Sequence, residues 1–330
     1  MKKIKIAIGC LVQWYEVEII EEYIVSLRQA IDHYGADNVI ADFVITGNET
    51  LEKSEIKTSE LLNRIASKVV KHLGAPIDLR MIYNQEDLIT ISSYRKEFND
   101  KYCTEADVLV WGESDMLVPK EMFTTINQVH NLLQDTWNGI GKYITTFGIC
   151  KMWDESWKHL EHPEFTDKPF IEGDKDNWWS LRYNMTLDEM NAFNNKVEEL
   201  DIRVFDKLKF NGCGLVISSD VVKSGVNIPQ SAFFVHEDTA FMVMAKKILP
   251  DIKQIHVANI LLVHNRKHPK KRSYIKGEEV IQDKSDVGKM RKTHKWYDIA
   301  NKMSQANVGT LFDTQAKTYT WDDVWQALKG

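Results

Sequence analysis

The chain has 330 residues, a formal net charge of −6 and a pI near 6.0. This length predicts either about two domains or one large α/β domain, and an apolar fraction of 43% is sufficient for a hydrophobic core. The acidic balance argues against a protein that coats nucleic acid, and no apolar run approaches the roughly 18 residues that a membrane-spanning helix needs.

The cysteines and the N-terminal segment indicate the compartment. Four cysteines are scattered along the chain without a Cys-x-x-Cys pair: Cys10, Cys103, Cys150 and Cys213. This pattern argues against a disulfide framework or a zinc site and favours a reducing cytoplasm. The start, MKKIKIAIGCLVQWYE, has only a short apolar run and no small-residue cleavage site. It is typical of a first strand and not of a signal peptide.

The first half of the chain alternates between predicted strands and helices. The segment 3–12 alternates and then becomes continuously apolar, as an interior strand does. Apolar residues spaced three and four apart predict a helix over 20–31. Further strands are predicted to begin at 41, 77 and 106, and further helices to cover 60–73 and 90–102. This order predicts a parallel sheet in a three-layer α/β fold.

The second half is less regular. A helix is predicted over 122–133, a strand from 142, a strand with a short helix from 208, a helix over 237–249 and a last strand from 255. The segment 152–206 is polar and rich in Trp, without a simple period. The segment 266–276 carries six Lys or Arg residues and no acid.

One stretch, VLVWGESDMLVP over 108–119, ends a buried strand in two carboxylates, Glu113 and Asp115. Charges at the end of a core strand are costly unless they are paired. Two carboxylates at one point form a hard-oxygen site that suits Mg²⁺ or Mn²⁺. A solvated turn before Pro119 is the alternative interpretation. Because ligands bind beyond the carboxyl ends of strands in open α/β sheets, Asn48 and this pair are expected to share one crevice.

Three later features could complete such a site. Gly212, in the segment NGCG, allows a close backbone approach to a ligand. Glu237 and Asp238 begin a predicted helix, where the helix dipole alone also favours acidic residues. His264 ends an apolar strand directly before the basic run, a place that suits a metal or phosphate site.

In this order the elements resemble the GT-A glycosyltransferases, especially the inverting, family-2-like ones, over roughly 3–276. The resemblance implies a three-layer α/β/α sandwich with a mostly parallel central sheet and an irregular insertion on the acceptor side. Residues 1–276 would form the catalytic domain, with a nucleotide-binding half at about 1–120 and an acceptor half at about 121–276. Residues 277–330 would form a C-terminal helical extension.

The resemblance also implies roles for these acidic residues. Asp115 would bind Mn²⁺ or Mg²⁺ on a nucleotide-diphosphate sugar, with His264 and Glu113 completing the metal shell. Asp238 would be the catalytic base, with Glu237 as the substitute. Gly212 would lie at the floor of the donor-sugar site.

Further residues would bind the two substrates. Val12 and Trp14 stand where the family carries its nucleotide-binding start, which this chain does not match, and Asn48 or Glu49 would touch the base or ribose. Arg95 is a candidate phosphate partner or a surface arginine on its helix, and Lys271 belongs to a basic loop that could close over the phosphates. The acceptor is expected to meet aromatic residues of the irregular segment: Trp153, Trp157, Trp178 and Trp179.

The predicted function is therefore metal-dependent transfer of a hexosyl or pentosyl group from a nucleotide sugar to an acceptor hydroxyl, with inversion. The acceptor could be a glycan, a small molecule or a modified base of DNA, since the basic run could follow phosphates. A nucleotidyltransferase and a non-catalytic carbohydrate-binding module are the alternatives.

Overall fold

A computed structural model describes residues 2–17, 19–47, 57–74, 77–83, 88–135, 139–148, 186–206, 208, 210, 212–264 and 295–329. Within these ranges no helix combines the length and the apolar character needed to cross a membrane.

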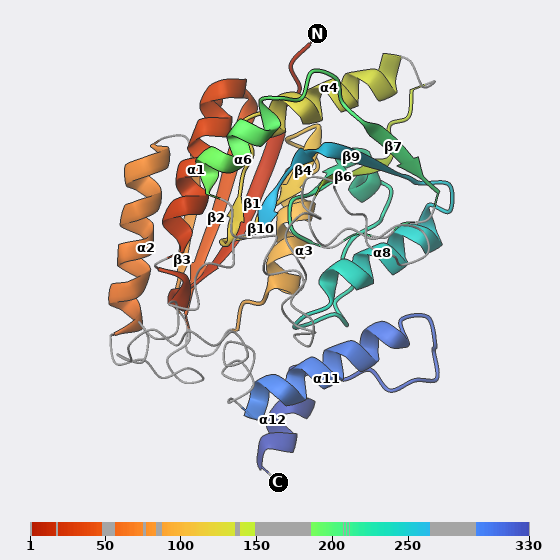
Figure 1. Cartoon of the computed structure of the whole chain (residues 1–330). Helices are drawn as coiled ribbons and strands as arrows, with labels where there is room; N and C mark the ends of the chain where they lie inside the picture. Colours follow the sequence, from red (N-terminus) through yellow and green to blue (C-terminus); the bar gives the residue numbers. More distant parts are fainter. Residues whose placement is uncertain are drawn as a thin grey trace, which may run out of the picture.

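The main element is an eight-stranded sheet with the strand order β3-β2-β1-β4-β8-β6-β9-β7 (Figure 1). The left half of this order, β3-β2-β1-β4, is parallel throughout. Strand β8 is antiparallel to both β4 and β6, and β7 is antiparallel to β9. Six of the eight strands therefore run in one direction, and their carboxyl ends meet at one edge.

The strands of the main sheet are β1 (Ile6–Gln13), β2 (Val39–Thr46), β3 (Ile77–Ile82), β4 (Val108–Trp111), β6 (Tyr143–Gly148), β7 (Ile202–Phe205), β8 (Leu215–Ser218) and β9 (Lys253–Leu261). The helices in the described ranges are α1 (Ile20–Tyr34), α2 (Thr58–Leu73), α3 (Ile91–Tyr102), α4 (Met122–Asp135), α6 (Leu187–Asn194), α7 (Ser219–Lys223), α8 (Glu237–Ile248), α11 (Lys295–Gly309) and α12 (Trp321–Lys329). Short 3₁₀ turns cover Trp14–Glu16 and Ala36–Asn38.

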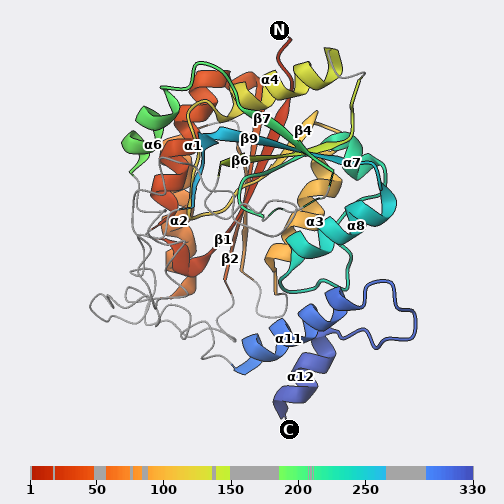
Figure 2. The ribbon, with the colours of Figure 1, turned by 45° about the vertical axis from the view of Figure 1, so that its right-hand side comes forward.

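Helices cover both faces of the sheet because its interior strands are apolar on both sides. In β1, Ile6, Ile8 and Cys10 point into a core shared with α1, α2 and α4, whereas Ala7 and Leu11 point into a core shared with α3, α7 and α8. Figure 2 shows the helices on either side of the sheet. The predicted three-layer, mostly parallel α/β fold is confirmed.

Two parts of the second half differ from the prediction. The segment expected to be irregular contains α6 and β7, and β7 forms the edge of the sheet against β9. The last strand, expected to be continuous, divides into β9 and β10 (Val263–His264). It divides because β9 pairs with β6, while β10 leaves the main sheet and pairs with β5 (Met116–Leu117) in a separate two-stranded sheet.

The C-terminal helices α11 and α12 lie at the end of the molecule below α3 and α8 (Figures 1 and 2). Aromatic rings join them to the chain that precedes α8: Phe234 contacts Trp296 at 5.6 Å and Trp321 at 5.7 Å between ring centroids. Both helices lie within 277–330, the range predicted as a helical extension, and this extension and its boundary stay a prediction.

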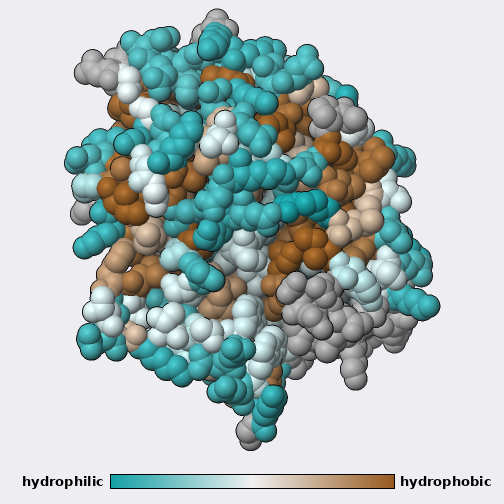
Figure 3. Space-filling view, turned by 180° about the vertical axis from the view of Figure 1, so that it is seen from behind, coloured by the Kyte–Doolittle hydropathy of each residue, from teal (hydrophilic) through white to brown (hydrophobic). Residues whose placement is uncertain are grey.

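The surface mixes polar and apolar side chains. On the face seen in Figure 3, polar groups are interrupted by apolar patches. The large hydrophobic residues exposed among the described residues are Val70, Met81, Tyr83, Val204, Ile248 and Phe312. The described cysteines, Cys10, Cys103 and Cys213, are buried free thiols.

Gly9 of β1 allows α3 to pack closely on the sheet. A Cβ atom at this position would lie 2.5 Å from Phe98 and 2.6 Å from the Tyr94 hydroxyl, both on α3. We expect Gly9→Ala to lower the free energy of unfolding by about 1–3 kcal/mol, because the two rings must move. Urea unfolding measures this change. Gly309→Ala is the control, since nothing lies within 4 Å of its Cβ position, and its change should stay within about 1 kcal/mol. Equal effects would contradict this account of Gly9.

Candidate functional site

The carboxylate motif lies where β4 ends. Trp111 is the last residue of β4, and the chain then turns through Glu113 and Asp115 into β5. Strand β5 pairs with β10 so that Met116 lies opposite His264. This pairing places the His264 backbone next to Asp115, although about 150 residues separate them in sequence. The side chain of His264 lies outside the described residues.

Arg95 joins the two acidic motifs. Its guanidinium donates from Nη2 to Oε1 of Glu113 at 2.8 Å and from Nη1 to Oε1 of Glu237 at 2.5 Å. Nη2 also donates to the Gly212 carbonyl at 3.1 Å, and the guanidinium carbon lies 4.7 Å from the centre of the Trp111 ring. A single side chain of α3 thus holds the end of β4, the segment before β8 and the start of α8 together.

Arg95 is 1% exposed, so the alternative of a surface arginine is wrong. Tyr94, Phe98 and Tyr102 are spaced four apart and form the buried stripe of α3, and Arg95 lies directly beside it. Position 212 must be glycine in this arrangement, because a Cβ atom there would lie 2.1 Å from Nη1 of Arg95. The close approach expected at Gly212 is therefore made to a guanidinium of the chain itself.

Burial and charge oppose each other in this cluster. The pKa of Glu237 is raised to about 7: burial is the largest cause, the Arg95 guanidinium opposes it, and the nearby Asp238 and Glu113 carboxylates raise the pKa as well. Burial lowers the pKa of Arg95, but Glu237 and Glu113 together raise it above its usual value. Arg95 therefore keeps its charge, and the acids around it share one buried cation.

Of the other predicted site residues, three are described by the structure and the rest lie outside the described ranges. Val12 and Trp14 are core residues, 0% and 3% exposed, and their contact with a nucleotide stays a prediction. Asp238 lies in the first turn of α8, half-buried, and its Oδ1 accepts a hydrogen bond from the Thr239 amide at 2.6 Å. The remaining candidates lie outside the described residues: Asn48, Glu49, Lys271, Trp153, Trp157, Trp178 and Trp179.

The donor set at the β5–β10 pair fits a divalent metal in part. Asp115 carries a carboxylate, which suits Mn²⁺ or another divalent ion. The imidazole of His264, predicted to complete the shell, lies outside the described residues. Glu113 suits this role less, since its Oε1 is engaged by Arg95. Within the described ranges, no group of three or more His, Cys, Asp or Glu side chains could hold a metal ion. Metal binding therefore stays a prediction.

Comparison with known proteins gives distant similarities. No protein-family model matches the chain, and no curated protein matches its sequence. The structure is similar to glucosyl-3-phosphoglycerate synthase from M. tuberculosis (13% identity, TM-score 0.39, covering 90% of this chain and 80% of that one). It is also similar to mannosyl-3-phosphoglycerate synthase from Rubrobacter xylanophilus (9%, 0.40, 97% and 80%) and to inositol-1-phosphate CTP transferase from T. maritima (10%, 0.38, 85% and 99%).

These neighbours include glycosyltransferases, the class that the sequence resembles, and nucleotidyltransferases, the class kept as an alternative.

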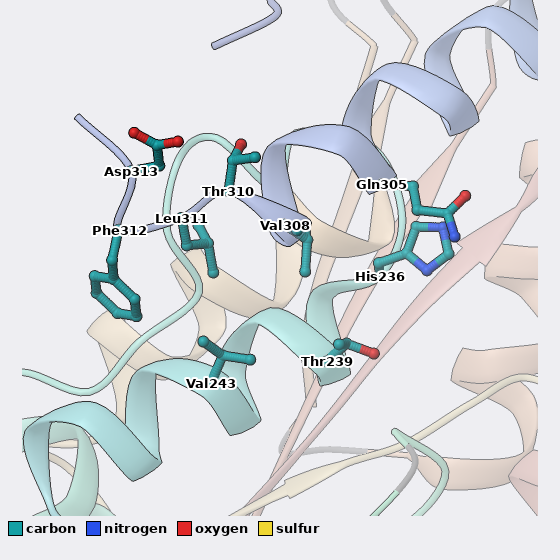
Figure 4. Close-up of a pocket in the computed structure, with 10 residues that line it drawn as sticks. His236, Thr239, Val243, Gln305, Val308, Thr310, Leu311, Phe312 and Asp313 are labelled. Atoms are coloured by element: carbon teal, nitrogen blue, oxygen red, sulfur yellow. The ribbon is translucent and has the colours of Figure 1, made fainter. Parts of the chain in front are cut away.

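Sequence reasoning missed His236 and the pocket beside it. His236 has φ 69° and ψ 25°, and it is the only non-glycine residue with a positive φ in the described part of the chain. It lines a pocket of about 760 Å³ between α8 and α11, with Thr239 and Val243 on one wall (Figure 4). A positive φ is a property of the folded backbone, and the presence of a His residue in the sequence does not predict it.

The Arg95 ion pairs can be tested by unfolding. We expect Arg95→Met to lower the free energy of unfolding by about 3–5 kcal/mol, because the buried Glu237 and the half-buried Glu113 lose their partner. Adding Glu113→Gln and Glu237→Gln should restore part of this loss in urea unfolding. Lys96→Met is the matched control, since the Lys96 side chain is 43% exposed and its described ion pair is with Asp100, and its change should stay within about 1 kcal/mol. A loss no larger than that of Lys96→Met would refute the bridging role.

The raised pKa of Glu237 predicts a pH dependence of stability. Between pH 4.5 and about 7 the native state keeps a proton that the unfolded chain has released, so this contribution is lost as the pH rises. Glu237→Gln should reduce the slope of unfolding free energy against pH in this window by up to about 1.4 kcal/mol per unit. Urea unfolding at pH 5, 6 and 7 with a chelator present checks this. Parallel curves for the two proteins would contradict it.

Proposed function

We propose that this chain is a metal-dependent glycosyltransferase that moves a sugar from a nucleotide-diphosphate sugar to an acceptor hydroxyl, with inversion. The observation that supports this most is the Arg95 bridge. It connects the carboxylate motif after β4 with the Glu237–Asp238 step at the start of α8. A metal-binding motif and a base must lie on either side of one sugar, and this bridge holds their two segments at the same edge of the sheet.

Arg95 also sets the charge of the site. Glu113 and Glu237 are salt-bridged to it, and one buried guanidinium offsets part of their negative charge. Without this offset, the acids would repel an incoming diphosphate at short range. Arg95 is therefore a positioning and charge-balancing residue in the proposal, and the carboxylates proposed to act in the reaction are Asp115 and Asp238.

Asp238 is the proposed base. It would take the proton of the acceptor hydroxyl while that oxygen attacks the anomeric carbon from the side opposite the leaving diphosphate. The Thr239 amide donates to its Oδ1 and restricts the carboxylate at the head of α8. A base on the side opposite the leaving group produces inversion.

Asp115 and His264 are the proposed metal-binding residues. A bound Mn²⁺ or Mg²⁺ would offset the charge that develops on the leaving diphosphate. The support for this pair is the β5–β10 register, which sets Met116 opposite His264. Glu113 is assigned to Arg95 instead.

The base assignment is tested by Asp238→Asn, which keeps the shape and removes the proton acceptor. We expect turnover of the accepted nucleotide sugar to fall by about 10²- to 10⁴-fold, with donor affinity in Mn²⁺ unchanged by calorimetry. Asp251→Asn, at an exposed turn after α8, should match the wild type.

Product analysis separates the alternatives. Release of a nucleoside diphosphate supports glycosyl transfer, whereas release of pyrophosphate from a nucleoside triphosphate supports nucleotidyl transfer. If neither UDP nor GDP binds in the presence of Mn²⁺, the transferase proposal is wrong. If the chain is a carbohydrate-binding module, Asp238→Asn should leave its affinity for carbohydrate unchanged.

A further inference from the structure

The chain just before α8, residues 231–236, carries no regular structure and leads directly into Glu237 and Asp238. Here it is called the strap. Its last residue, His236, adopts the left-handed conformation, and the His236 carbonyl accepts the hydrogen bond from the Ala240 amide in the first turn of α8. The direction in which α8 starts therefore depends on the backbone of His236.

A left-handed histidine backbone is unfavourable by itself and persists only where its surroundings hold it. Helix α11 supplies these surroundings from one face. Asn307 donates to the Ser231 carbonyl at 2.9 Å, Ser304 donates to the Val235 carbonyl at 2.9 Å, and the Nε2 atom of His236 is hydrogen-bonded to Oδ1 of Asn301 at 3.1 Å. Residues 301, 304 and 307 are spaced three apart and share one side of the helix.

The burial of Ser304 and Asn307 also indicates that α11 holds the strap. Ser304 and Asn307 are 0% and 2% exposed. Polar side chains are rarely buried on a helix unless they have hydrogen-bond partners. Ser304 has the Val235 carbonyl of the strap, and Asn307 has the Ser231 carbonyl of the strap together with the Tyr319 backbone. Apolar contacts add to these bonds, since the Phe234 ring packs edge-on against Tyr297 at 4.9 Å between centroids. Thr90, the N-cap of α3, donates to the Phe233 carbonyl at 3.0 Å from the other side.

We infer that α11 is a positioning element of the candidate site, and that Asn301 is its principal positioning residue. By holding the His236 ring, Asn301 keeps the left-handed turn that sets Glu237 against Arg95 and fixes Asp238 at the head of α8. The C-terminal helices thus contribute to the proposed reaction without touching its substrates. This inference rests on the proposed function for its kinetic consequence and on the fold alone for its structural one.

The test compares Asn301→Ala, which removes the partner of His236, with Asn301→Asp, which keeps an acceptor oxygen. Lys302→Ala is the matched control, because Lys302 is an exposed neighbour on the same helix. Amide hydrogen exchange over 231–240, donor binding by calorimetry in Mn²⁺, and steady-state kinetics are measured for each variant.

For Asn301→Ala we expect faster exchange over 231–240 and a kcat lowered roughly 10- to 100-fold, since a misplacement of about 1 Å can cost about 10²-fold. Donor affinity should stay within about twofold, because the residues that bind the diphosphate are untouched. Asn301→Asp should restore most of kcat, and Lys302→Ala should match the wild type.

Two results would overturn the inference. One is a rate of amide hydrogen exchange over 231–240 that is the same in Asn301→Ala as in the wild type. The other is a loss of kcat that Asn301→Asp does not rescue and that follows the loss of global stability. If the wild-type chain transfers no sugar, the proposed function fails, and the exchange measurement alone then decides whether Asn301 holds the strap.

Discussion

The buried guanidinium of Arg95 is the interaction on which the site depends. It is bonded to Glu113 after β4, to Glu237 at the start of α8 and to the Gly212 carbonyl before β8, and it lies over Trp111. An unpaired cation at this depth would be very costly, so the three segments must come together around it when the chain folds. Likewise, the cost of burying the acidic residues around Arg95 is offset by their ion pairs with its guanidinium.

The same constraint explains why the site extends into the C-terminal helices. Glu237 reaches Arg95 only if α8 begins in the right direction, and this direction depends on the left-handed turn at His236. That turn is held by Asn301 and Ser304 of α11. A chain of contacts therefore runs from helix α11, near the C-terminal end of the sequence, back to the end of β4. Bonds that look remote from the carboxylates determine where the carboxylates lie.

Much of the fold was predictable. The alternation of apolar strands and amphipathic helices up to Trp111 depends on local periodicity, and these elements appear at the expected places. The burial of Arg95 could have been found as well, since it stands beside the stripe of Tyr94, Phe98 and Tyr102. By contrast, α6 and β7 were missed, because β7 is a short, partly exposed edge strand whose pairing with β9 is long-range.

The sequence by itself determined the layers of the fold and which strand ends carry carboxylates, because period and residue type are local properties of the chain. Only the tertiary structure decided which groups meet. It paired Glu113 and Glu237 with Arg95, set His264 beside Asp115 through the β5–β10 pair, and held His236 in a left-handed turn. These outcomes depend on contacts between residues that are far apart in sequence, and on the cost of burying a charge without its partner.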